Sequence, residues 1–571
     1  MTATAVRPRS RWIIPNAPDG VQVSALCAEL NLPELLGRLL VARGYGAPDA
    51  ARRYLRPRLE HLHDPTTLID LDRAVERIVG AVRSGEMILI HGDYDVDGIC
   101  STTIMTRTLR RLGAQVIPFI PQRVRDGYDL TAAGVRAARD AGARLVITCD
   151  CGTSAAAPVA ELQDAGIDVI ISDHHLPGGP LPKSFAILNP RRADCTSLDK
   201  DLCAAGVAFK LALAVTKAMG ASPNPVLNMI DLVALATIAD VAPLRGENRV
   251  LASFGIRQLS QTKSVGLRAM IRAAGLDRKA ITAGRVGFIL APRLNAAGRI
   301  GSALRGVELL LSDEESHANP IARELEELNA RRQEMDRGVL EQAREMVGKL
   351  DLDATYGLVL AAEGWHPGVI GIVASRIVEE FGRPTILIAL DGAEGKGSGR
   401  SIAPFDLHAG ISQCRDVLLR FGGHRSAAGV TVARNQVEEF ARRFNDVARA
   451  ALTPDDLVPE LRADLDVHLQ EVDDRLEELL RYVEPCGVGN PSPVMIARGV
   501  RVAGTPKAVG KDGLRVLLEQ DGTQLTALGW GLAHRAAELA AGNIIDVAFR
   551  LERDEWNGAS RLQARIADFR A

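Results

Sequence analysis

A histidine and three aspartates occupy alternate positions in the stretch HGDYDVDG, residues 91–98. They are His91, Asp93, Asp95 and Asp97. Carboxylates this close together raise one another's pKa values unless a metal ion or other cations neutralise them. The stretch therefore predicts a cation site, which is either a calcium loop of the EF-hand type or the metal centre of a hydrolase.

The spacing of the following residues excludes the calcium loop. An EF-hand needs a glutamate at its twelfth position, and counting from Asp93 that position is Ile104. The apolar run MILI, residues 87–90, comes directly before the stretch and is typical of a buried parallel strand. In an extended chain, side chains two residues apart share a face. We therefore expect a metal centre at the end of a strand.

Composition places the chain among soluble globular proteins. It has 571 residues, of which 47% are hydrophobic and 25% charged, and at roughly 150 residues per domain this favours three or four domains. No apolar run approaches the roughly 18 residues of a membrane span, and the N-terminus lacks the apolar core of a secretory signal. We expect a cytoplasmic protein without a membrane partner. The net charge of −2 implies that a nucleic acid would need a local basic surface.

Short apolar runs alternate with helical stretches from residue 81 to about residue 245. The runs are MILI, QVIPFI, RLVITC, DVIIS and FAILN. This alternation predicts a doubly wound α/β domain with a parallel sheet. Such sheets bind ligands at the carboxyl ends of their strands, so further metal ligands should occur there.

Acids and histidines do follow these runs. Asp150 ends RLVITCD, the triplet Asp173, His174 and His175 ends DVIISDHH, and Asp240 ends the apolar helical segment LVALATIAD. Each alone is typical of a turn or a helix cap. Together with HGDYDVDG they predict one centre for a hard or borderline divalent cation.

Two cysteines flank Asp150. Cys149 and Cys151 are closer in sequence than the ligand pairs of zinc sites, which usually have two to four residues between them. In an extended strand both would face away from Asp150. We interpret both as packing residues.

The whole chain divides into five expected segments. Residues 1–80 form an N-terminal helical and loop segment that packs on the core, 81–313 the catalytic domain, and 314–350 an amphipathic connecting helix. Residues 351–457 form a second α/β unit with the glycine-rich stretches EGKGSGRS and FGGHRSAAG. Residues 458–571 contain closely spaced short strands, which predict a small β-barrel.

Eight motifs follow one another in a known order: HGDYDVDG, TCDCGTS, SDHHLPG, TIADVAPLRGENR, APRLNAAGR, WHPGVIGIVASR, GSGRSI and FGGHRSAAG. With them, roughly residues 50–500 resemble the DHH phosphoesterase superfamily, and within it the bacterial RecJ family of single-stranded-DNA exonucleases. The resemblance implies a multidomain α/β fold with a parallel-sheet DHH catalytic domain and a DHH-associated substrate-binding domain. It also implies a C-terminal OB-like barrel that binds nucleic acid.

The same resemblance implies two Mn²⁺ or Mg²⁺ ions. Asp150 would bridge them, with the remaining ligands His91, Asp95, Asp97, His174 and Asp240, and with Asp93 and His175 in or next to the shell. The catalytic set would be Asp95, Asp97, Asp150, His174, His175, Asp240 and His424. The expected reaction is a two-metal phosphodiester hydrolysis without a covalent nucleophile.

The resemblance further implies a set of substrate-binding residues: Arg123, Tyr128, Arg293, Asn295, Arg299, Ser398, Arg400, Gly422, Gly423 and His424. Arg400 with Ser398 would hold a terminal 5′-phosphate, because a guanidinium binds phosphate through two hydrogen bonds. Glycines beside His424 would let the backbone approach the scissile phosphate. Tyr128 would stack on a base.

The function implied is a 5′-to-3′ exonuclease that hydrolyses single-stranded DNA to 5′-mononucleotides in DNA repair and recombination. The expected partners are 5′-phosphorylated single-stranded DNA, a helicase and a single-strand-binding protein, and the expected state is a monomer. Alternatives are an oligoribonuclease, a cyclic-dinucleotide or dinucleotide phosphodiesterase or a pyrophosphatase of the same superfamily, and a non-catalytic scaffold. The small-substrate enzymes are usually shorter and lack the barrel. In the barrel we expect the basic residues Lys507, Lys511 and Arg515 to contact DNA, while Trp530 and Trp556 either stack on bases or belong to the core.

Overall fold

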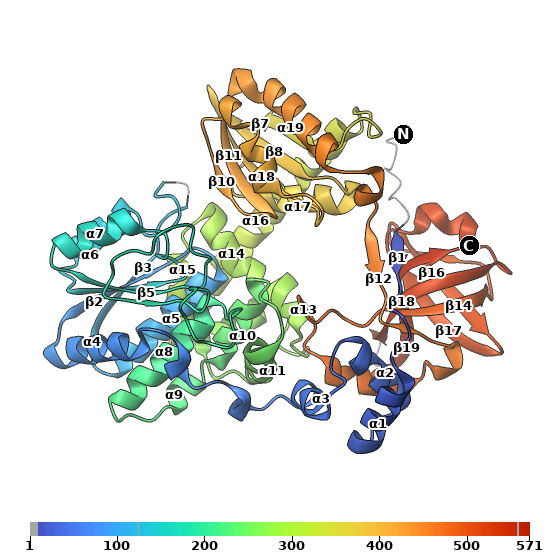
Figure 1. Cartoon of the computed structure of the whole chain (residues 1–571), viewed down its shortest axis with the longest axis horizontal. Coiled ribbons are helices and arrows are strands. Elements are labelled where there is room, and N and C mark those ends of the chain that lie inside the picture. The colour runs from blue at the N-terminus through green and yellow to red at the C-terminus, as the bar shows by residue number, and fades with distance from the viewer. Residues whose placement is uncertain (1–9, 124, 557–558) are drawn as a thin grey trace. The chain divides into compact units, whose positions relative to one another are not determined.

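The computed structural model describes residues 10–123, 125–556 and 559–571, and these form two compact units (Figure 1). Unit 2 contains residues 53–332 and 483–491. Unit 1 contains residues 10–52, 333–482 and the rest of the described chain from residue 492. This division is coarser than the five expected segments, whose boundaries stay predictions.

Unit 2 is built on a five-stranded parallel sheet with the order β3-β2-β4-β5-β6. The strands are β2 (Met87–Gly92), β3 (Gln115–Phe119), β4 (Leu145–Cys149), β5 (Asp168–Ser172) and β6 (Ala186–Leu188). The first strand, β2, lies between its successors β3 and β4, so the winding direction reverses there. In doubly wound sheets, ligands bind at this switch point. The expected parallel sheet is confirmed.

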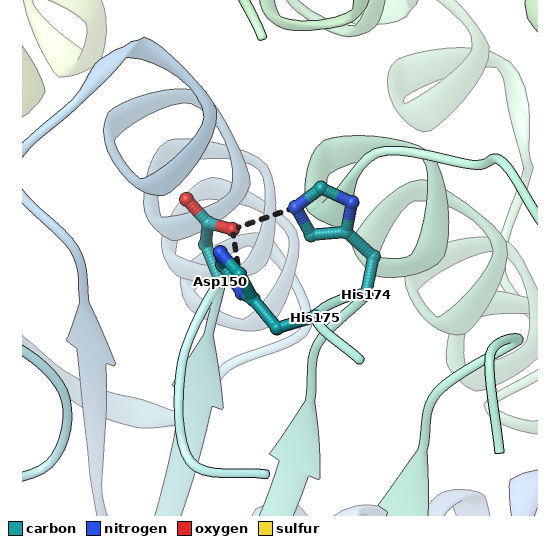
Figure 2. A group of neighbouring side chains, drawn as sticks. All are labelled: Asp150, His174 and His175. Carbon is teal, nitrogen blue, oxygen red and sulfur yellow. Dashed lines mark ion pairs between the residues drawn. The ribbon is translucent and has the colours of Figure 1, made fainter. Parts of the chain in front are cut away.

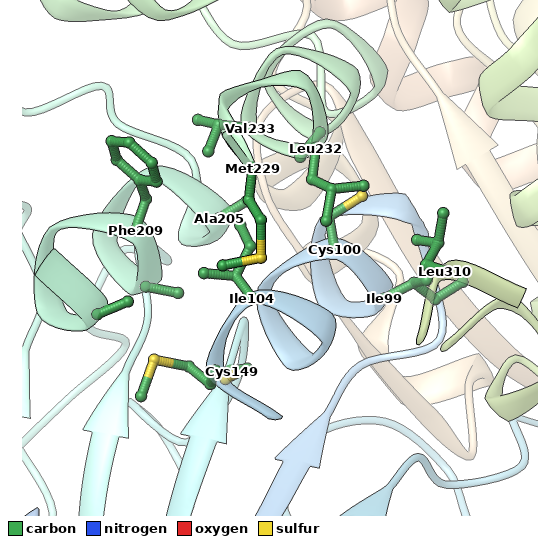
Figure 3. Close-up of a cluster of buried hydrophobic side chains, with 14 of the residues drawn as sticks. Ile99, Cys100, Ile104, Cys149, Ala205, Phe209, Met229, Leu232, Val233 and Leu310 are labelled. Atoms are coloured by element: carbon green, nitrogen blue, oxygen red, sulfur yellow. The ribbon is translucent and has the colours of Figure 1, made fainter. Parts of the chain in front are cut away.

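Both faces of this sheet are covered by helices, as the apolar strand sequences predict. Ile88 and Ile90 point into one core and Leu89 into the other. The first core is completed by α4 (Leu71–Ser84), α5 (Val96–Arg111), α8 (Ala204–Ala218) and α10 (Ile230–Ala239), as Figure 3 shows in part. The second core is completed by α6 (Ala132–Asp140) and α7 (Ala156–Asp164) (Figure 1). The sheet thus holds its strand ends between two layers of helices.

The remaining helices of unit 2 follow the sheet in sequence. They are α9 (Asn224–Leu227), α11 (Gly246–Leu259), α12 (Val265–Ala273), α13 (Ala283–Arg285), α14 (Ala291–Ile300) and α15 (Leu304–Leu311). A π-helical turn at Val286–Leu290 leads into α14. The long helix α16 (Glu315–Val347) then passes from unit 2 into unit 1, and it is the expected connecting helix.

Residues 483–491, which lie far from the rest of unit 2 in the sequence, complete this unit. We call this segment the strap. The buried guanidinium of Arg249 donates hydrogen bonds to the carbonyls of Val483 (3.1 Å) and Glu484 (3.0 Å). The Asn490 amide donates to the Val483 carbonyl at 2.8 Å. Because these hydrogen bonds are made to backbone carbonyls, they fix the backbone path of the strap and do not depend on the side chains of Val483 and Glu484.

Unit 1 contains a mixed five-stranded sheet with the order β10-β11-β9-β8-β7. Its strands are β7 (Leu358–Glu363), β8 (Thr385–Asp391), β9 (Glu394–Arg400), β10 (Arg420–Gly423) and β11 (Ala427–Ala433). The end of α16 and α17 (Ile370–Phe381) pack on one face, and α18 (Leu407–Ser412) and α19 (Val437–Ala451) on the other. This is the expected second α/β unit.

The C-terminal part of unit 1 is a β-barrel. Its sheet has the order β13-β14-β18-β19-β17-β16-β15, and an added β14–β16 pairing closes five of the strands into a ring, as in an OB-fold. The strands are β13 (Leu465–Asp466), β14 (Met495–Val502), β15 (Lys507–Val509), β16 (Gly513–Gln520), β17 (Thr523–Gly529), β18 (Ile544–Trp556) and β19 (Ala559–Arg570). The expected barrel is confirmed.

The N-terminal residues of unit 1 attach to the barrel region. Strand β1 (Arg11–Ile13) pairs in parallel with β12 (Glu460–Arg462). The helices here are α1 (Gly20–Leu30), α2 (Glu34–Ala42), α3 (Pro48–Leu55) and α20 (Asp474–Leu480). Among the described residues, no helix combines the length and the apolar character that crossing a membrane requires.

Candidate metal centre

The loop after β2 places three aspartates at the start of α5. Asp95 caps this helix, since its carboxylate accepts hydrogen bonds from the N–H groups of Asp97 (2.9 Å) and Gly98 (3.1 Å). Two glycines allow the tight path, because a Cβ at Gly98 would overlap the backbone of Asp93 and one at Gly298 would overlap that of Tyr94. The alternating pattern therefore continues into a helix cap and not into an extended strand.

Asp97 is the most buried of these carboxylates, with 1% of its surface exposed. Its two oxygens accept hydrogen bonds of 2.7 Å from the N–H groups of Ala204 and Ala205, at the positive end of α8. Burial, together with the charge of Asp95, nevertheless raises the pKa of Asp97 to about 7. A cation bound nearby would return it to the ionised state.

Asp150 lies between both histidines of the DHH triplet (Figure 2). Its carboxylate oxygen Oδ1 is 3.2 Å from His174 Nε2 and 3.8 Å from His175 Nδ1. The residue has φ +70°, a left-handed conformation that non-glycine residues rarely adopt. This turn directs the Asp150 carboxylate across the sheet edge toward β5.

The ligand atoms gather into three groups of the described residues, each with all its atoms within 4.8 Å of one another. The groups are Asp150 with His174 and His175, Asp97 with His174 and Asp240, and Asp93 with Asp95 and Asp150. Asp150 belongs to two groups, which fits the bridging role expected for it. His174 also belongs to two groups.

Four buried atoms of this region have no hydrogen-bond partner among the described residues: His91 Nε2, Asp93 Oδ1, Asp150 Oδ1 and His174 Nε2. Buried polar atoms are normally satisfied, so this concentration needs a ligand to explain it. Burial raises the pKa values of Asp93 and Asp150 well above the usual range. It lowers the pKa of His174, and it lowers the pKa of His91 to about 4. Neutral imidazoles with carboxylates are a donor set that fits Mn²⁺ or Mg²⁺.

Asp173, the first residue of the DHH triplet, orients the turn. Its carboxylate accepts hydrogen bonds from the N–H groups of Thr153 (3.0 Å) and His174 (2.7 Å), and it lies 2.8 Å from His175 Nδ1. Burial opposes a charge on His175, but the contact with Asp173 outweighs it and raises the pKa of His175 to about 9. The same contact, with others, outweighs burial and lowers the pKa of Asp173. Apart from the DHH triplet itself, the sequence contains no signal that Asp173 orients this turn and His175.

His91 stands apart from the three groups. Its Nδ1 lies 3.5 Å from the Cys151 sulfur, and a Cβ at Gly134 of α6 would come within 2.6 Å of the His91 ring. Cys151 is buried, as expected of a packing residue, and its sulfur packs against His91 because β4 ends at Cys149 and the left-handed Asp150 turns the chain. His91 as a metal ligand stays a prediction.

Asp240 ends α10, and its carboxylate oxygen is 3.7 Å from His174 Nε2. Burial, followed by the charge of Asp97, raises the pKa of Asp240 to about 7. Val241 has φ +60°, which is strained for a β-branched residue. The strap holds the loop that follows, since the N–H of Leu244 donates to the Val488 carbonyl at 2.7 Å.

Three of the expected substrate residues of unit 2 lie against the loop of aspartates or the DHH triplet. Arg123 lies over the Tyr94 ring at 4.9 Å, and the half-exposed Tyr128 has its hydroxyl 3.0 Å from His175 Nε2. Asn295 accepts a hydrogen bond from the N–H of Val96 at 3.1 Å. Their roles toward a substrate stay predictions.

Two arginines of α14 were also expected to bind substrate. Arg293 is paired with Glu326, with Nε 2.5 Å from the carboxylate, and it also donates to the Ile289 carbonyl. Arg299 is partly buried. The Glu326 pairing gives Arg293 a second, structural role, and contact of either arginine with DNA stays a prediction.

The remaining substrate residues lie in unit 1. Arg400 donates hydrogen bonds to the Ser398 hydroxyl (3.1 Å) and the Gly399 carbonyl (2.8 Å), and Gly371 in the first turn of α17 lies against both side chains. Gly422 and Gly423 end the exposed edge strand β10, directly before the exposed His424. Gly423 has φ +141°, and a Cβ there would collide with β11. These contacts are compatible with phosphate binding, which stays a prediction.

Three family models match the chain. Residues 87–237 match the N-terminal domain of the DHH family, residues 354–450 the DHHA1 domain and residues 463–568 the RecJ OB domain. The single-stranded-DNA-specific exonuclease RecJ of Bacillus subtilis is 37% identical over 563 residues, 98% of this chain and 71% of the relative. That of Salmonella typhimurium is 34% identical over 560 residues, 94% of this chain and 96% of the relative.

A solved structure agrees with these matches. The crystal structure of RecJ from Thermus thermophilus in complex with Mn²⁺ has a TM-score of 0.85 and 33% identity, with 99% of this chain and 80% of that chain covered. A second crystal structure from the same organism, in complex with Mg²⁺, has a TM-score of 0.80. The resemblance seen in the sequence motifs is confirmed, and the chain belongs to the RecJ family of single-stranded-DNA-specific exonucleases.

Proposed function

We propose that the protein is a divalent-metal-dependent exonuclease that degrades single-stranded DNA in the 5′-to-3′ direction and releases 5′-mononucleotides. The observation that carries the proposal is the cluster of buried, unpartnered ligand atoms at the switch point of the parallel sheet, in a chain of the RecJ family. The closed barrel favours a polymer over the small substrates of the alternative phosphodiesterases.

The residues that would hold the metals are those of the three groups except His175, with Asp150 shared. Bound divalent cations supply activation of water and neutralisation of the charge that develops on the phosphate. Asp173 keeps His175 oriented and charged, so the His175 imidazolium faces the site as a hydrogen-bond donor. The hydroxyl of the half-exposed Tyr128 lies next to His175 Nε2 and is protonated at neutral pH, as a phenol normally is.

Recognition of the strand end is assigned to unit 1. Arg400 and Ser398 lie beside the first turn of α17, where the helix dipole favours an anion. The basic residues Lys507 and Arg515 face each other across β15 and β16, next to the half-exposed Trp530. The side chain of Trp556 lies outside the described residues. A helicase and a single-strand-binding protein as partners, a monomeric state and a cytoplasmic location stay predictions.

The test uses 5′-phosphorylated oligodeoxynucleotides labelled at either end, incubated with the full-length protein in Mn²⁺ or in EDTA. We expect a 5′ label to appear directly as mononucleotide, and a 3′ label to remain on progressively shorter strands, only with metal. Hydrolysis of dinucleotides or cyclic dinucleotides without any shortening of the polymer would contradict the proposal. Binding without hydrolysis under all metal conditions would favour the scaffold.

A further inference from the structure

A cavity of about 490 Å³ lies within unit 2, and no residue of the three metal-ligand groups lines it. It is formed by the last turn of α5, the end of α8 and the first turns of α10 and α12. Its volume falls within the range of roughly 300–1,000 Å³ that is usual for small-molecule sites. The proposed function leaves this cavity without a role.

The wall of the cavity is mainly apolar, with Leu112, Val226, Met229, Leu232, Val265 and Leu310. Thr108, Thr216 and Asp231 are buried polar residues of the lining, each 3% exposed. The Thr108 hydroxyl has no hydrogen-bond partner among the described residues, but its oxygen has almost no exposed surface and so does not face the cavity. The wall therefore offers a ligand mainly apolar contacts.

The rim of the cavity is positively charged. The exposed Arg111 and Lys263 line it, and the described part of the chain shows no carboxylate paired with either. Both carboxylates of the lining are already engaged, Asp313 with Arg107 at 2.8 Å and Asp231 with the hydroxyl of Thr262 at 2.7 Å. The positive end of α12, which begins at Val265, adds to the same field. The rim therefore suits an anion.

Three helices connect this cavity with the metal centre. Helix α5 begins at the capping residue Asp95 and ends in the cavity, and α8 begins with the N–H groups that bind Asp97 and ends there through Thr216. Helix α10 runs in the opposite sense, from Met229 in the cavity to Asp240. Their side chains share one buried core (Figure 3). These packed helices therefore form a continuous physical connection between the cavity and the metal centre.

We propose that the cavity binds a small organic phosphate of the nucleoside 5′-monophosphate class and that this binding changes the metal affinity of the centre. The phosphate would contact Arg111, Lys263 and the start of α12, and the ring system would lie on the apolar wall. The proposed reaction releases the same class of molecule, but occupancy of the cavity does not depend on that reaction.

Binding is tested by calorimetric titration of the full-length protein with a deoxynucleoside 5′-monophosphate in EDTA, so that the metal centre cannot hold the phosphate. We expect Lys263→Glu and Arg111→Glu each to weaken binding by roughly tenfold or more, as expected for a charge-assisted contact. Arg83→Glu makes the same charge change on the exposed end of α4 and should leave it unchanged. No binding by the wild type would overturn the site, and equal losses in all three variants would place the ligand elsewhere.

Inorganic phosphate tests the contribution of the wall. Phosphate alone should bind about tenfold more weakly or worse than the nucleotide, because it lacks the ring system. Equal affinities of phosphate and nucleotide would overturn the assignment of the wall.

The coupling is tested by measuring the Mn²⁺ affinity with and without the nucleotide. We expect a change of roughly fivefold or more in the wild type, by reciprocal linkage, and none in Lys263→Glu. Nucleotide binding with an unchanged Mn²⁺ affinity would overturn the coupling. These readouts do not use hydrolysis, so a failure of the proposed function and a failure of this inference are distinguishable.

Discussion

Three carboxylates of the candidate metal centre are buried in unit 2, with Asp93 3%, Asp97 1% and Asp150 2% exposed, whereas strand β10, which leads to His424 in unit 1, is exposed along its whole length. The first region concentrates like charges and leaves polar atoms unpartnered, so it is unstable without a cation. The second region presents groups that water already solvates. Changes in the buried region should therefore affect stability and activity together, and changes in the exposed regions should affect recognition alone.

The sharpest test of this contrast is Asp150→Asn, which keeps the side-chain size, and asparagine tolerates the left-handed backbone. Hydrolysis should fall by roughly a thousandfold or more, since the lost interaction with the metals is worth several kcal/mol in the transition state. The metal-free variant should at the same time be more stable than the metal-free wild type, because it no longer has to keep a buried carboxyl protonated at a pH where the unfolded chain has lost that proton. Thermal unfolding in EDTA measures the stability of the metal-free protein, and a metal-dependent nuclease assay measures the loss of hydrolysis.

The control for Asp150→Asn is Asp140→Asn at the exposed end of α6, where neither quantity should change. A purified, folded Asp150→Asn protein with wild-type turnover would break the contrast and remove Asp150 from the centre.

The second test uses pH. The pKa values of Asp97 and Asp240 are raised by burial to about 7, from an ordinary value of 3.8, so the folded metal-free protein holds protons that the unfolded chain has lost. Its stability should fall as the pH rises toward 7. Metal ions compete with those protons, so Mn²⁺ should bind about tenfold more tightly per pH unit for each proton displaced.

Thermal unfolding with and without Mn²⁺ at about pH 5.5 and about pH 8 measures this effect. The rise in Tm caused by Mn²⁺ should be clearly larger at the higher pH. An equal rise at both values would mean that these carboxylates are ionised before the metal binds.

The third test concerns recognition of the strand end. Arg400→Gln should weaken turnover of a 5′-phosphorylated strand roughly ten- to a hundredfold more than that of a 5′-hydroxyl strand, since a charge-assisted contact is worth about 1.5–3 kcal/mol. The stability of the variant should stay close to that of the wild type. Arg415→Gln, an exposed arginine of the same sheet domain, serves as the control. Equal losses on the two substrates would place Arg400 away from the 5′ end.

The smallest effect is expected in the barrel. Removing Lys507 and Arg515 together, as alanines, should weaken binding of a long single strand only a few-fold, but the salt dependence of binding should become shallower by roughly 1.4 in log–log slope if each residue neutralises one phosphate. Replacing the exposed Lys349 and Arg475 in the same way should change neither value. An unchanged slope in the first double variant would assign the barrel to another partner.

The sheet and most of the centre were predictable because they depend on local sequence. The apolar runs fix the strands, and the rule for strand ends then brings Asp150, His174 and Asp97 together without knowledge of long-range contacts. The position of Cys151 was not predictable from alternation, because Asp150 leaves the extended conformation at that point. Alternation likewise gave no sign of the contact from Asp173 to His175, which depends on the turn after β5.

Contacts between residues far apart in sequence were also beyond prediction. Neither the Glu326 partner of Arg293 nor the Val96 partner of Asn295 has a local signal, so both residues were expected to face the substrate only. The strap lies more than 230 residues from Arg249 in the chain, and its sequence contains no pattern that indicates a place in unit 2.

The strap gives the order of protein synthesis a consequence for folding. Residues 333–482 are translated between the last helix of unit 2 and the strap, which takes about 8–30 s at roughly 5–20 residues per second. During this interval a growing chain has its sheet and all of its metal ligands but lacks the carbonyls that bind Arg249 and the loop after Asp240. We therefore expect the nascent nuclease to remain a weak metal binder until the linker to the barrel has left the ribosome. Purified chains that end at residue 482 and at residue 491 both lack the barrel strands from β14 onward, and a lower Mn²⁺ affinity of the shorter chain would show that the strap completes the centre.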